Sequence, residues 1–455
     1  MPTRRQSQEI PSRRKFLGLA AACPAFTLVS CAVLGRGGKI PPSERVNVAA
    51  IGAGGMAGND IEECHKAGAN IVALCDVDDE RAAETYDKFP RVPKYKDFRQ
   101  MLDREHKNID AVIVGTPDHT HAVAVMTAIQ RGKHVYCEKP LARSVYEVRQ
   151  LMNAAKHAGI STQLGNQGHS YDHIRIFCEW IWDNAIGPVR EVHVFCDSCY
   201  GRMEELAKLG ERHPVPEVLD WDLWLGPAPV RPFNPMYIRG MWRGWMQFGT
   251  GAIGDWVCHL VDPVFWALDL GSPVSIRAET GEYDPKIHGE CYPPATKVYY
   301  EFPARGERPP LRLVWYDGGL VPPRPDELEE GREMPKKGAL VIGDEGKIIY
   351  GSHGADGVRI IPEQKMKAYK KPDPTLPRSA GHRKEWLLSC KSGVPAGSNF
   401  EYGGPLTEIG LLALIAVRLS GETLRWNGSR AEFTNSSLAN QLLRETYRPD
   451  WTLES

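Results

Sequence analysis

The sequence predicts an α/β protein that begins with a doubly wound parallel sheet and continues into a second, strand-rich domain. Between residues 46 and 165, short apolar runs alternate with helical patterns, which is the rhythm of strand–helix–strand units. A glycine-rich loop follows the first of these runs. Beyond residue 166, strand-like runs are separated by glycine and proline, as in a further sheet.

The composition is that of a globular protein and argues against a nucleic-acid partner. The chain has 455 residues, of which 42% are hydrophobic and 25% charged, enough for two domains. Residues 1–31 carry five basic side chains and one acidic one, so the net charge of -1 leaves about -5 for the remainder. An acidic remainder does not favour binding to the phosphate backbone of a nucleic acid. We expect no metal, because a single CxxC pair, Cys196 and Cys199, is weak evidence for zinc.

The N-terminus resembles an export signal. Arg13 and Arg14 precede an apolar run over residues 18–33, which is too short for a comfortable membrane-spanning helix. SRRKFL resembles a twin-arginine signal, whose pathway exports folded proteins. LVSC resembles a lipobox, which would place a lipid on Cys31. We expect a bacterial protein that is periplasmic or anchored to a membrane as a lipoprotein; a disordered or amphipathic N-terminal arm is the alternative.

A dinucleotide-binding loop follows the first apolar run. VNVAAIGAGGMAG predicts a buried strand over residues 46–51, a glycine loop and a helix. Gly52 allows the tight turn, Gly54 lets the backbone approach a pyrophosphate, and Gly55 keeps the helix entry open. Ala57 stands where a third glycine often occurs. Because free N–H groups at the helix N-terminus would face phosphates, the sequence predicts a Rossmann domain.

The end of the next strand favours NAD over NADP. ANIVALCD ends in Asp76, 24 residues after Gly52, near the spacing expected for an acid that binds the ribose. Asp76 and Asp78 would repel a 2′-phosphate. The alternative for Asp76 is a solvated carboxylate or a helix cap. The runs at 110–117 and 132–140 predict further strands of the same parallel sheet.

Three motifs resemble the Gfo/Idh/MocA family of glucose–fructose oxidoreductases and inositol dehydrogenases, over roughly residues 46–430. They are the glycine loop, TPDHTH, and EKP after a strand. The resemblance implies a second α/β domain with a large open, mostly antiparallel sheet. It also implies that Lys139 lies beside the nicotinamide and the substrate hydroxyl. The implied cofactor contacts are Gly52, Gly54, Gly55, Met56, Ala57, Asp76, Thr116, Pro117, His121, Glu138, Lys139, Asn166 and Gln167.

A helix predicted from about Ala252 carries Asp255 and His259, to which the resemblance also gives roles in the site. Asp255 and His259 are four residues apart and so share one helical face. Judged by the residues alone, a histidine on a partly apolar helix is more often structural than catalytic. The resemblance implies that His259 is the acid/base, and we expect Asp255 to orient it or to share its proton.

Aromatic and basic side chains near this helix are candidates for sugar binding. Trp242 and Trp245 flank Arg243 in a glycine-rich loop, and indoles suit the apolar faces of sugar rings. Burial is the alternative for each tryptophan. His169 and His173 are four residues apart, just after the domain crossover, and could line the sugar site or bind a metal. The predicted substrate contacts are Lys139, His169, Trp242, Arg243, Asp255 and His259.

Together these features predict an NAD-dependent oxidoreductase that acts on a secondary hydroxyl of a sugar or cyclitol. His259 would take the hydroxyl proton and Lys139 would stabilise the alkoxide. An exported enzyme has no free pool of NAD, so we expect tightly bound, internally recycled NAD. An NAD-dependent glycosidase and a non-catalytic, cofactor-bound sugar-binding protein are the alternatives. In the family the classical glycosidase-like branch has a different lysine motif, so EKP favours the dehydrogenase.

The same features give the expected organisation of the chain. Because the open sheets of this family usually pair, we expect a homodimer or homotetramer. The expected parts are a signal over 1–31, a linker over 32–45, the NAD-binding domain over 46–165, and the substrate-binding and oligomerisation domain over 166–455.

Overall fold

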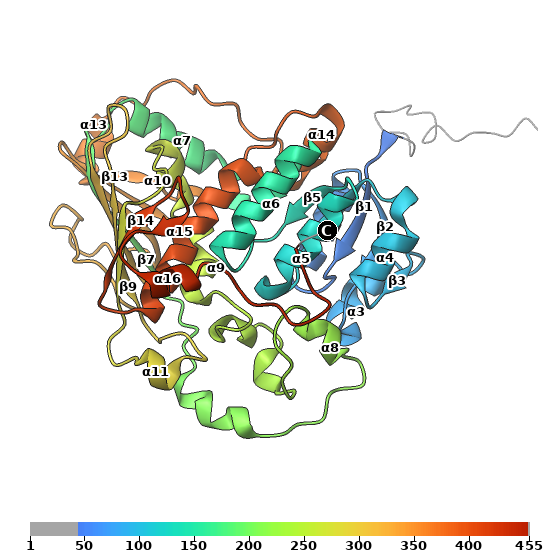
Figure 1. Cartoon of the computed structure of the whole chain (residues 1–455). Helices are drawn as coiled ribbons and strands as arrows, with labels where there is room; N and C mark the ends of the chain where they lie inside the picture. The colour runs from blue at the N-terminus through green and yellow to red at the C-terminus, as the bar shows by residue number, and fades with distance from the viewer. Residues whose placement is uncertain (1–43, 454–455) are drawn as a thin grey trace, which may run out of the picture. The chain divides into compact units, whose positions relative to one another are not determined.

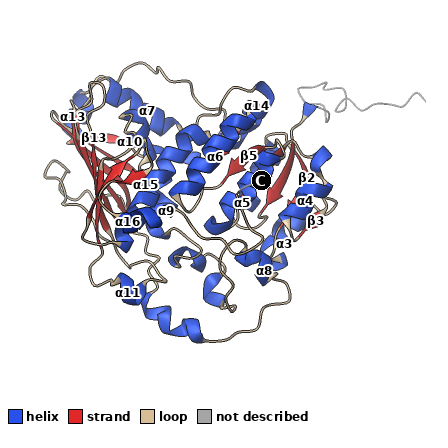
Figure 2. Cartoon of the chain, in the orientation of Figure 1, coloured by secondary structure: helices blue, strands red, loops and turns tan. Residues whose placement is uncertain are grey.

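The computed structural model describes residues 44–453, and this part of the chain forms two β-sheets with helices between and around them (Figures 1 and 2). One sheet has six strands and the other nine within the described residues. Arg13, Arg14 and Cys31 lie outside the described residues. The export signal and the lipid anchor therefore stay predictions.

The first sheet confirms the predicted doubly wound parallel arrangement. Its strand order is β3-β2-β1-β4-β5-β6, and every recorded pairing is parallel. The order reverses between β1 and β4, which makes a switch point where ligands bind in such sheets. The strands are β1 (Asn47–Ile51), β2 (Asn70–Cys75), β3 (Lys94–Tyr95), β4 (Ala111–Val114), β5 (His134–Cys137) and β6 (Thr162–Leu164).

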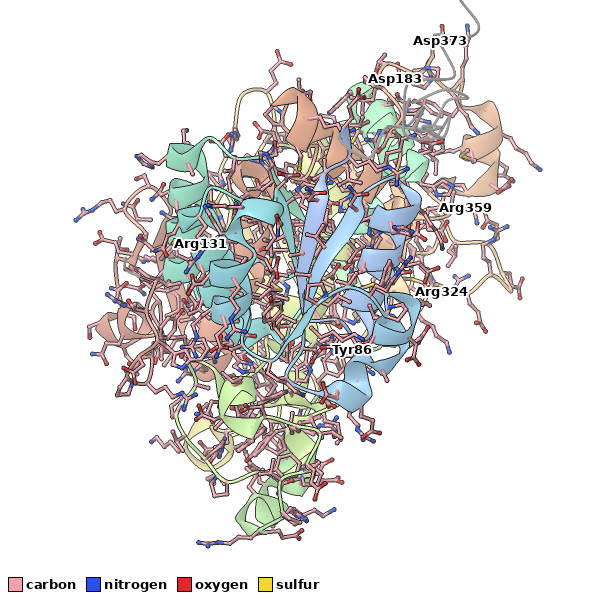
Figure 3. All side chains as sticks on the ribbon, turned by 90° about the vertical axis from the view of Figure 1, so that its right-hand side faces the viewer. Tyr86, Arg131, Asp183, Arg324, Arg359 and Asp373 are labelled. Atoms are coloured by element: carbon pink, nitrogen blue, oxygen red, sulfur yellow. The ribbon has the colours of Figure 1, made fainter. Side chains whose placement is uncertain are left out.

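Alternate residues of these strands pack against helices on opposite faces of the sheet. Ala49 and Val112 belong to the core under one set of helices, whereas Val48 and Ile113 belong to the core under the other. Strand geometry requires this alternation. In Figure 3, Tyr86 on α3 and Arg131 after α5 lie on opposite sides of the sheet. The helices are α2 (Met56–Lys66) and α3 (Asp79–Lys88) on one face, and α4 (Phe98–Arg104), α5 (Asp118–Gln130) and α6 (Val145–Ala158) on the other.

The second sheet is large and mostly antiparallel, as the resemblance implies. Its order is β13-β12-β11-β7-β10-β9-β8-β14-β15, and β7 and β10 are its parallel pair. The strands are β7 (Val189–Cys196), β8 (Ser275–Glu279), β9 (Lys297–Phe302), β10 (Leu311–Tyr316), β11 (Lys337–Gly343), β12 (Lys347–Gly351), β13 (Arg359–Ile361), β14 (Thr423–Asn427) and β15 (Glu432–Phe433).

Helices α6, α9 (Gly251–Leu260) and α15 (Phe400–Arg418) lie between the two sheets (Figure 1). Helix α15 is long and apolar enough to cross a membrane, but 83% of its most apolar window is buried inside the protein, as expected for a core helix. The other helices are α7 (Asp172–Trp182), α8 (Trp221–Leu225), α10 (Asp262–Ala267), α11 (Pro285–His288), α12 (Ser352–Ala355), α13 (Glu363–Ala368), α14 (His382–Ser392) and α16 (Ser437–Gln441).

The proline-rich stretch 321–337 packs partly against the second sheet. Leu328 is only 3% exposed and joins Val314, Leu340 and Ile349 in an apolar cluster. The end of the stretch, Lys337, begins β11. The segment therefore covers part of one sheet face as well as linking two strands.

Candidate active site

A cleft opens where the parallel strands end, at the point where the strand order reverses. Residues that follow β1, β2, β4 and β5 line it. In open α/β sheets this edge is where ligands bind. The predicted residues that line the cleft are Gly52, Gly54, Met56, Asp76, Thr116, Pro117, His121, Glu138, Lys139, Trp242 and Arg243.

The glycine loop has the geometry that its sequence predicts. Gly52 has φ +88°, and a Cβ there would lie 2.8 Å from the carbonyl oxygen of Gly115. Gly55 has φ +59° and stands at the N-cap of α2. The side chain of Ala57 packs against Gly115, so this alanine serves the close helix–strand packing of the third glycine. The loop and the open N-terminus of α2 fit a pyrophosphate.

Asp76 ties the end of β2 to this loop. Its carboxylate accepts hydrogen bonds from the backbone N–H groups of Ala53 (2.8 Å) and Asp78 (3.0 Å). Burial raises the pKa of Asp76. Arg81 on α3, which sequence reasoning missed, reaches across the loop to Gly54 and Gly55 and lines the cleft.

Replacing Asp76 with alanine is expected to weaken the preference for NAD over NADP by roughly 10- to 100-fold, the value of a hydrogen bond to a charged group. The variant loses both the ribose acceptor and the charge that repels a 2′-phosphate. The ratio of the two dissociation constants measures this effect. Asp87→Ala, at an exposed position of α3 that does not line the cleft, is the control; an unchanged ratio in Asp76→Ala would remove Asp76 from the site.

Lys139 and Asp255 form a buried ion pair at the other end of the cleft, although they are far apart in the sequence. Lys139 Nζ lies 2.5 Å from Asp255 Oδ1, and the two side chains are 11% and 10% exposed. Arg243 Nε donates to the same oxygen at 3.2 Å, and the hydroxyl of Tyr200 donates to Oδ2 at 2.7 Å. Burial opposes both charges, but the pair overcomes it: the pKa of Lys139 is raised and that of Asp255 is lowered.

Glu138 precedes Lys139 in the EKP motif, but its surroundings disfavour its charged form. Burial, reinforced by the carboxylate of Asp60, raises the pKa of Glu138 to about 8. Asp60 itself is bound by Arg383 of α14. The raised pKa favours the protonated form of Glu138, which could donate a hydrogen bond at the lining of the cleft.

His121 holds the TPDHTH and EKP turns together. Its Nδ1 lies 2.8 Å from the carbonyl oxygen of Pro140, and its Nε2 lies 2.8 Å from that of Thr116. The ring is 1% exposed. Since Pro140 follows Lys139 directly, this link fixes the turn that carries the lysine.

His259 is close to Lys139, but it is not paired with Asp255 as we expected. It is 4% exposed and makes no hydrogen bond within residues 44–453, and its Nδ1 is fully buried. The carboxylate of Asp255 is instead occupied by Lys139, Arg243 and Tyr200. Burial, with the nearby charge of Lys139, holds the pKa of His259 well below its ordinary value. Both effects favour the neutral imidazole, the form that can accept a proton.

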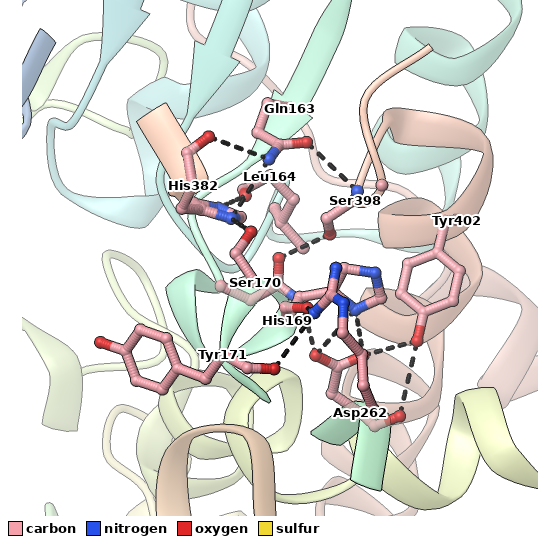
Figure 4. Close-up of polar contacts among 12 residues, drawn as sticks. Gln163, Leu164, His169, Ser170, Tyr171, Asp262, His382, Ser398 and Tyr402 are labelled. Atoms are coloured by element: carbon pink, nitrogen blue, oxygen red, sulfur yellow. Dashed lines mark hydrogen bonds and ion pairs between the residues drawn. The ribbon is translucent and has the colours of Figure 1, made fainter. Parts of the chain in front are cut away.

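Asn166 and His169 belong to a buried polar network and do not line the cleft. Figure 4 shows His169 with Asp262 and Ser398 of this network. Asn166 Nδ2 donates to Asp262 Oδ2 (3.1 Å), while its Oδ1 accepts from Ser398 (2.6 Å). His169 Nδ1 lies 3.1 Å from Asp262 Oδ1, and its ring stacks on Trp266. The amide of Asn166 and the ring nitrogen of His169 are thus occupied by the protein, which the sequence motifs did not reveal.

Gln167, next in the chain, differs from these two residues. Its Oε1 is buried and accepts no hydrogen bond from the described residues. A buried acceptor without a donor is costly, so this oxygen fits a ligand donor. Trp245, by contrast, is fully buried with its indole N–H bonded to the carbonyl of Met236 (2.8 Å), so the expectation that it faces a sugar is wrong.

A long excursion between β7 and α9 closes the cleft from the side of the second sheet. Leu223, Trp224 and Ile238 of this excursion line the cleft. Hydrogen bonds join this excursion to residues that follow β2 and β3. The carbonyl of Val218 accepts them from Asp79 N (3.1 Å) and Lys96 Nζ (3.1 Å). The ion pair of Arg239 with Glu80 and the bridge between Asp78 and Leu219 add to this attachment.

Two family models match this chain. Residues 46–165 match the model of the Gfo/Idh/MocA oxidoreductase family described as the NAD-binding Rossmann fold, and residues 204–302 match that of its C-terminal α/β domain. The chain is 34% identical over 119 residues to an inositol 2-dehydrogenase of Rubrobacter xylanophilus, covering 26% of this chain and 33% of that protein. It is 33% identical over 126 residues to an α-N-acetylgalactosaminidase of Shewanella oneidensis, covering 26% and 27%.

These matches span a third or less of the length of either curated relative. A solved aldose–aldose oxidoreductase of Caulobacter crescentus, complexed with glycerol, shares the fold with a TM-score of 0.56 at 17% identity, over 84% of this chain and 100% of that one. Residues 46–165 are thus a domain of the NAD-binding Rossmann type of the Gfo/Idh/MocA oxidoreductase family, and residues 204–302 match the C-terminal α/β domain of that family.

Proposed function

We propose that this protein is an NAD-dependent oxidoreductase that acts on a secondary hydroxyl of a sugar or cyclitol. The observation that carries the proposal is the buried charge cluster at one end of the nucleotide cleft, where Lys139 meets Asp255 and Arg243. The similarity to an inositol 2-dehydrogenase supports the substrate class.

The residues of the cleft fit the cofactor. The glycine loop leaves room that a Cβ at Gly52 would fill, and Asp76 stands at the end of β2, where an acid that binds the ribose is expected. When bound, NAD supplies the acceptor and donor of hydride. The protein must then hold the substrate carbon in place, take the hydroxyl proton and stabilise the charge that develops on oxygen.

Lys139 would stabilise the charge that develops on oxygen, and His259 would take the hydroxyl proton. The ammonium of Lys139 is kept charged by Asp255, so it can stabilise an alkoxide. Asp255 also holds Tyr200 and Arg243, and so positions donors around the same point. His259, neutral and without a hydrogen-bond partner among the described residues, would take the proton.

The excursion supports a cofactor that stays bound through the cycle. Its attachments to the β2 side, through Val218, Leu219 and Arg239, hold it beside Asp78 and Asp79, where it would slow the release of a bound dinucleotide. Such retention suits an exported enzyme, and we propose twin-arginine export directed by Arg13 and Arg14.

Lysine at both positions should stop export; normal export of that variant would contradict the twin-arginine assignment. Lipidation at Cys31 and a homodimer or homotetramer belong to the same proposal.

A glycosidase that works through a transient keto sugar is the second candidate, favoured by the similarity to an α-N-acetylgalactosaminidase. There, oxidation at C3 makes the C2 proton acidic, loss of that proton expels the C1 substituent, water adds at C1, and hydride returns to C3. The same cluster of Lys139 and His259 could serve both reactions.

The test is to add myo-inositol, D-glucose or an aryl α-N-acetylgalactosaminide to the purified protein with its own bound nucleotide. Reduction of bound NAD by a polyol, without release of the aryl group, would support the oxidoreductase. Release of the aryl group would favour the glycosidase. A third outcome is that the purified protein binds a sugar and yet does not convert it, either with its own nucleotide alone or with added NAD. That result would favour the non-catalytic sugar-binding protein.

A further inference from the structure

A second imidazole lies against His259. The ring of His353, on α12 just after β12, has its centroid 4.3 Å from that of His259, with 32° between the ring planes. Trp256 meets both rings edge-on, at 5.8 Å and 5.7 Å. His259 is thus enclosed by aromatic groups from two elements that are distant in the sequence.

The backbone that carries His353 is strained. His353, Gly354 and Ala355 have φ of +54°, +79° and +63°, the left-handed region that non-glycine residues rarely adopt. The turn packs tightly against Gly168, where a Cβ would meet the backbone of His353 and Gly354. Strain of this kind persists where the surroundings impose it, often at functional sites. Here it directs the ring of His353 onto His259.

The two rings differ in exposure and share charged neighbours. His259 is buried, whereas His353 is partly exposed. His259 faces the charges of Lys139, Asp255, His353 and His382. His353 faces Lys139, Asp255, Lys337 and Asp356. Two imidazoles in contact do not readily carry two positive charges, and the more exposed ring is the easier one to protonate.

We propose that His353 is a positioning residue for His259: it holds the ring by stacking, and it takes an incoming proton from solvent first, so that His259 stays an unprotonated base. The stacking and the order of protonation do not depend on what the enzyme does. Their catalytic meaning rests on the proposed function, in which His259 accepts the proton of the substrate hydroxyl.

The first test follows the imidazoles directly, by NMR titration of the full protein with histidines labelled at Cε1. Signals of His259 and His353 are identified by their loss in His259→Asn and His353→Asn. We expect His353 to titrate at higher pH than His259. His353→Phe, which keeps an aromatic ring but no charge, and His353→Asn, which suits the left-handed backbone, should each raise the proton affinity of His259 by roughly tenfold.

His173→Asn is the matched control, because His173 is exposed and lies 3.4 Å from the same Asp356. It should leave the titration of His259 unchanged. The proposal is overturned if His259 titrates above His353 in the wild type. It is equally overturned if neither substitution at His353 moves the titration of His259.

The second test is the pH profile of kcat/KM with myo-inositol, whose acidic limb should move to higher pH in both His353 variants. If the NMR shifts appear but no polyol reduces bound NAD in the wild type, the proposed function fails and the pairing of the rings stands. If the wild type oxidises the polyol and the His259 titration does not move, the role of His353 fails and the proposed function stands.

Discussion

Replacing Lys139 with alanine is expected to lower turnover of a sugar or cyclitol by about 10²- to 10³-fold, the cost of removing one group that stabilises a developing oxyanion. The ammonium lies 2.5 Å from Asp255 and is the positive end of the buried pair. Its loss should affect kcat more than the amount of bound NAD, because the glycine loop and Asp76 lie at the other end of the cleft. Turnover and nucleotide content of the same preparation measure the two effects.

Lys133→Met is the matched control for this substitution. Lys133 lies just before the same strand, β5, at its opposite end, and its ammonium binds the carbonyl of His106. That variant should keep its activity. Full turnover by Lys139→Ala with a polyol that the wild type oxidises would contradict the role given to Lys139.

Replacing His259 with alanine is expected to lower turnover by about 10²- to 10⁴-fold, as the loss of a general base does. NAD should stay bound, because His259 does not line the cleft. The double variant with Lys139→Ala should lose less than the product of the two separate losses, since both groups act on one transition state. His157→Ala, an exposed histidine on α6, should have no effect.

The pH dependence gives a second measure of His259. Burial and Lys139 lower its pKa, so the base form persists to lower pH than for an ordinary histidine. Activity should therefore be lost only as the pH falls below the usual histidine range. An acidic limb at or above that range, or full activity of His259→Ala, would show that another group is the base.

The first half of the fold could be predicted because its signals are local. An apolar run, glycines at fixed spacing and an acid after the next strand all lie within residues 46–76. Strand β11 has weaker local signals, since it follows a proline-rich segment and contains Gly338. It is a strand because β7 and β12 pair with both of its edges.

The candidate site could be predicted only in part, because several of its contacts join residues that are far apart in the chain. Lys139 and Asp255 stood out in their motifs, but the ion pair between them joins residues 116 apart in the chain. Tyr200 and His353 carry no motif and reach the site only through tertiary packing. Conversely, the motifs gave no sign that polar groups of His169 and Asn166 belong to a buried network with Asp262.

The nucleotide carried by the protein tests the central claim most directly. Protein purified without added cofactor should be denatured and the released nucleotides separated and counted. The account predicts close to one NAD or NADH per chain, in large excess over NADP and NADPH, because Asp76 selects the unphosphorylated ribose and the excursion bound to Glu80 and Asp79 retains it. Protein that is empty and binds NAD only weakly, or that carries NADP instead, would contradict it.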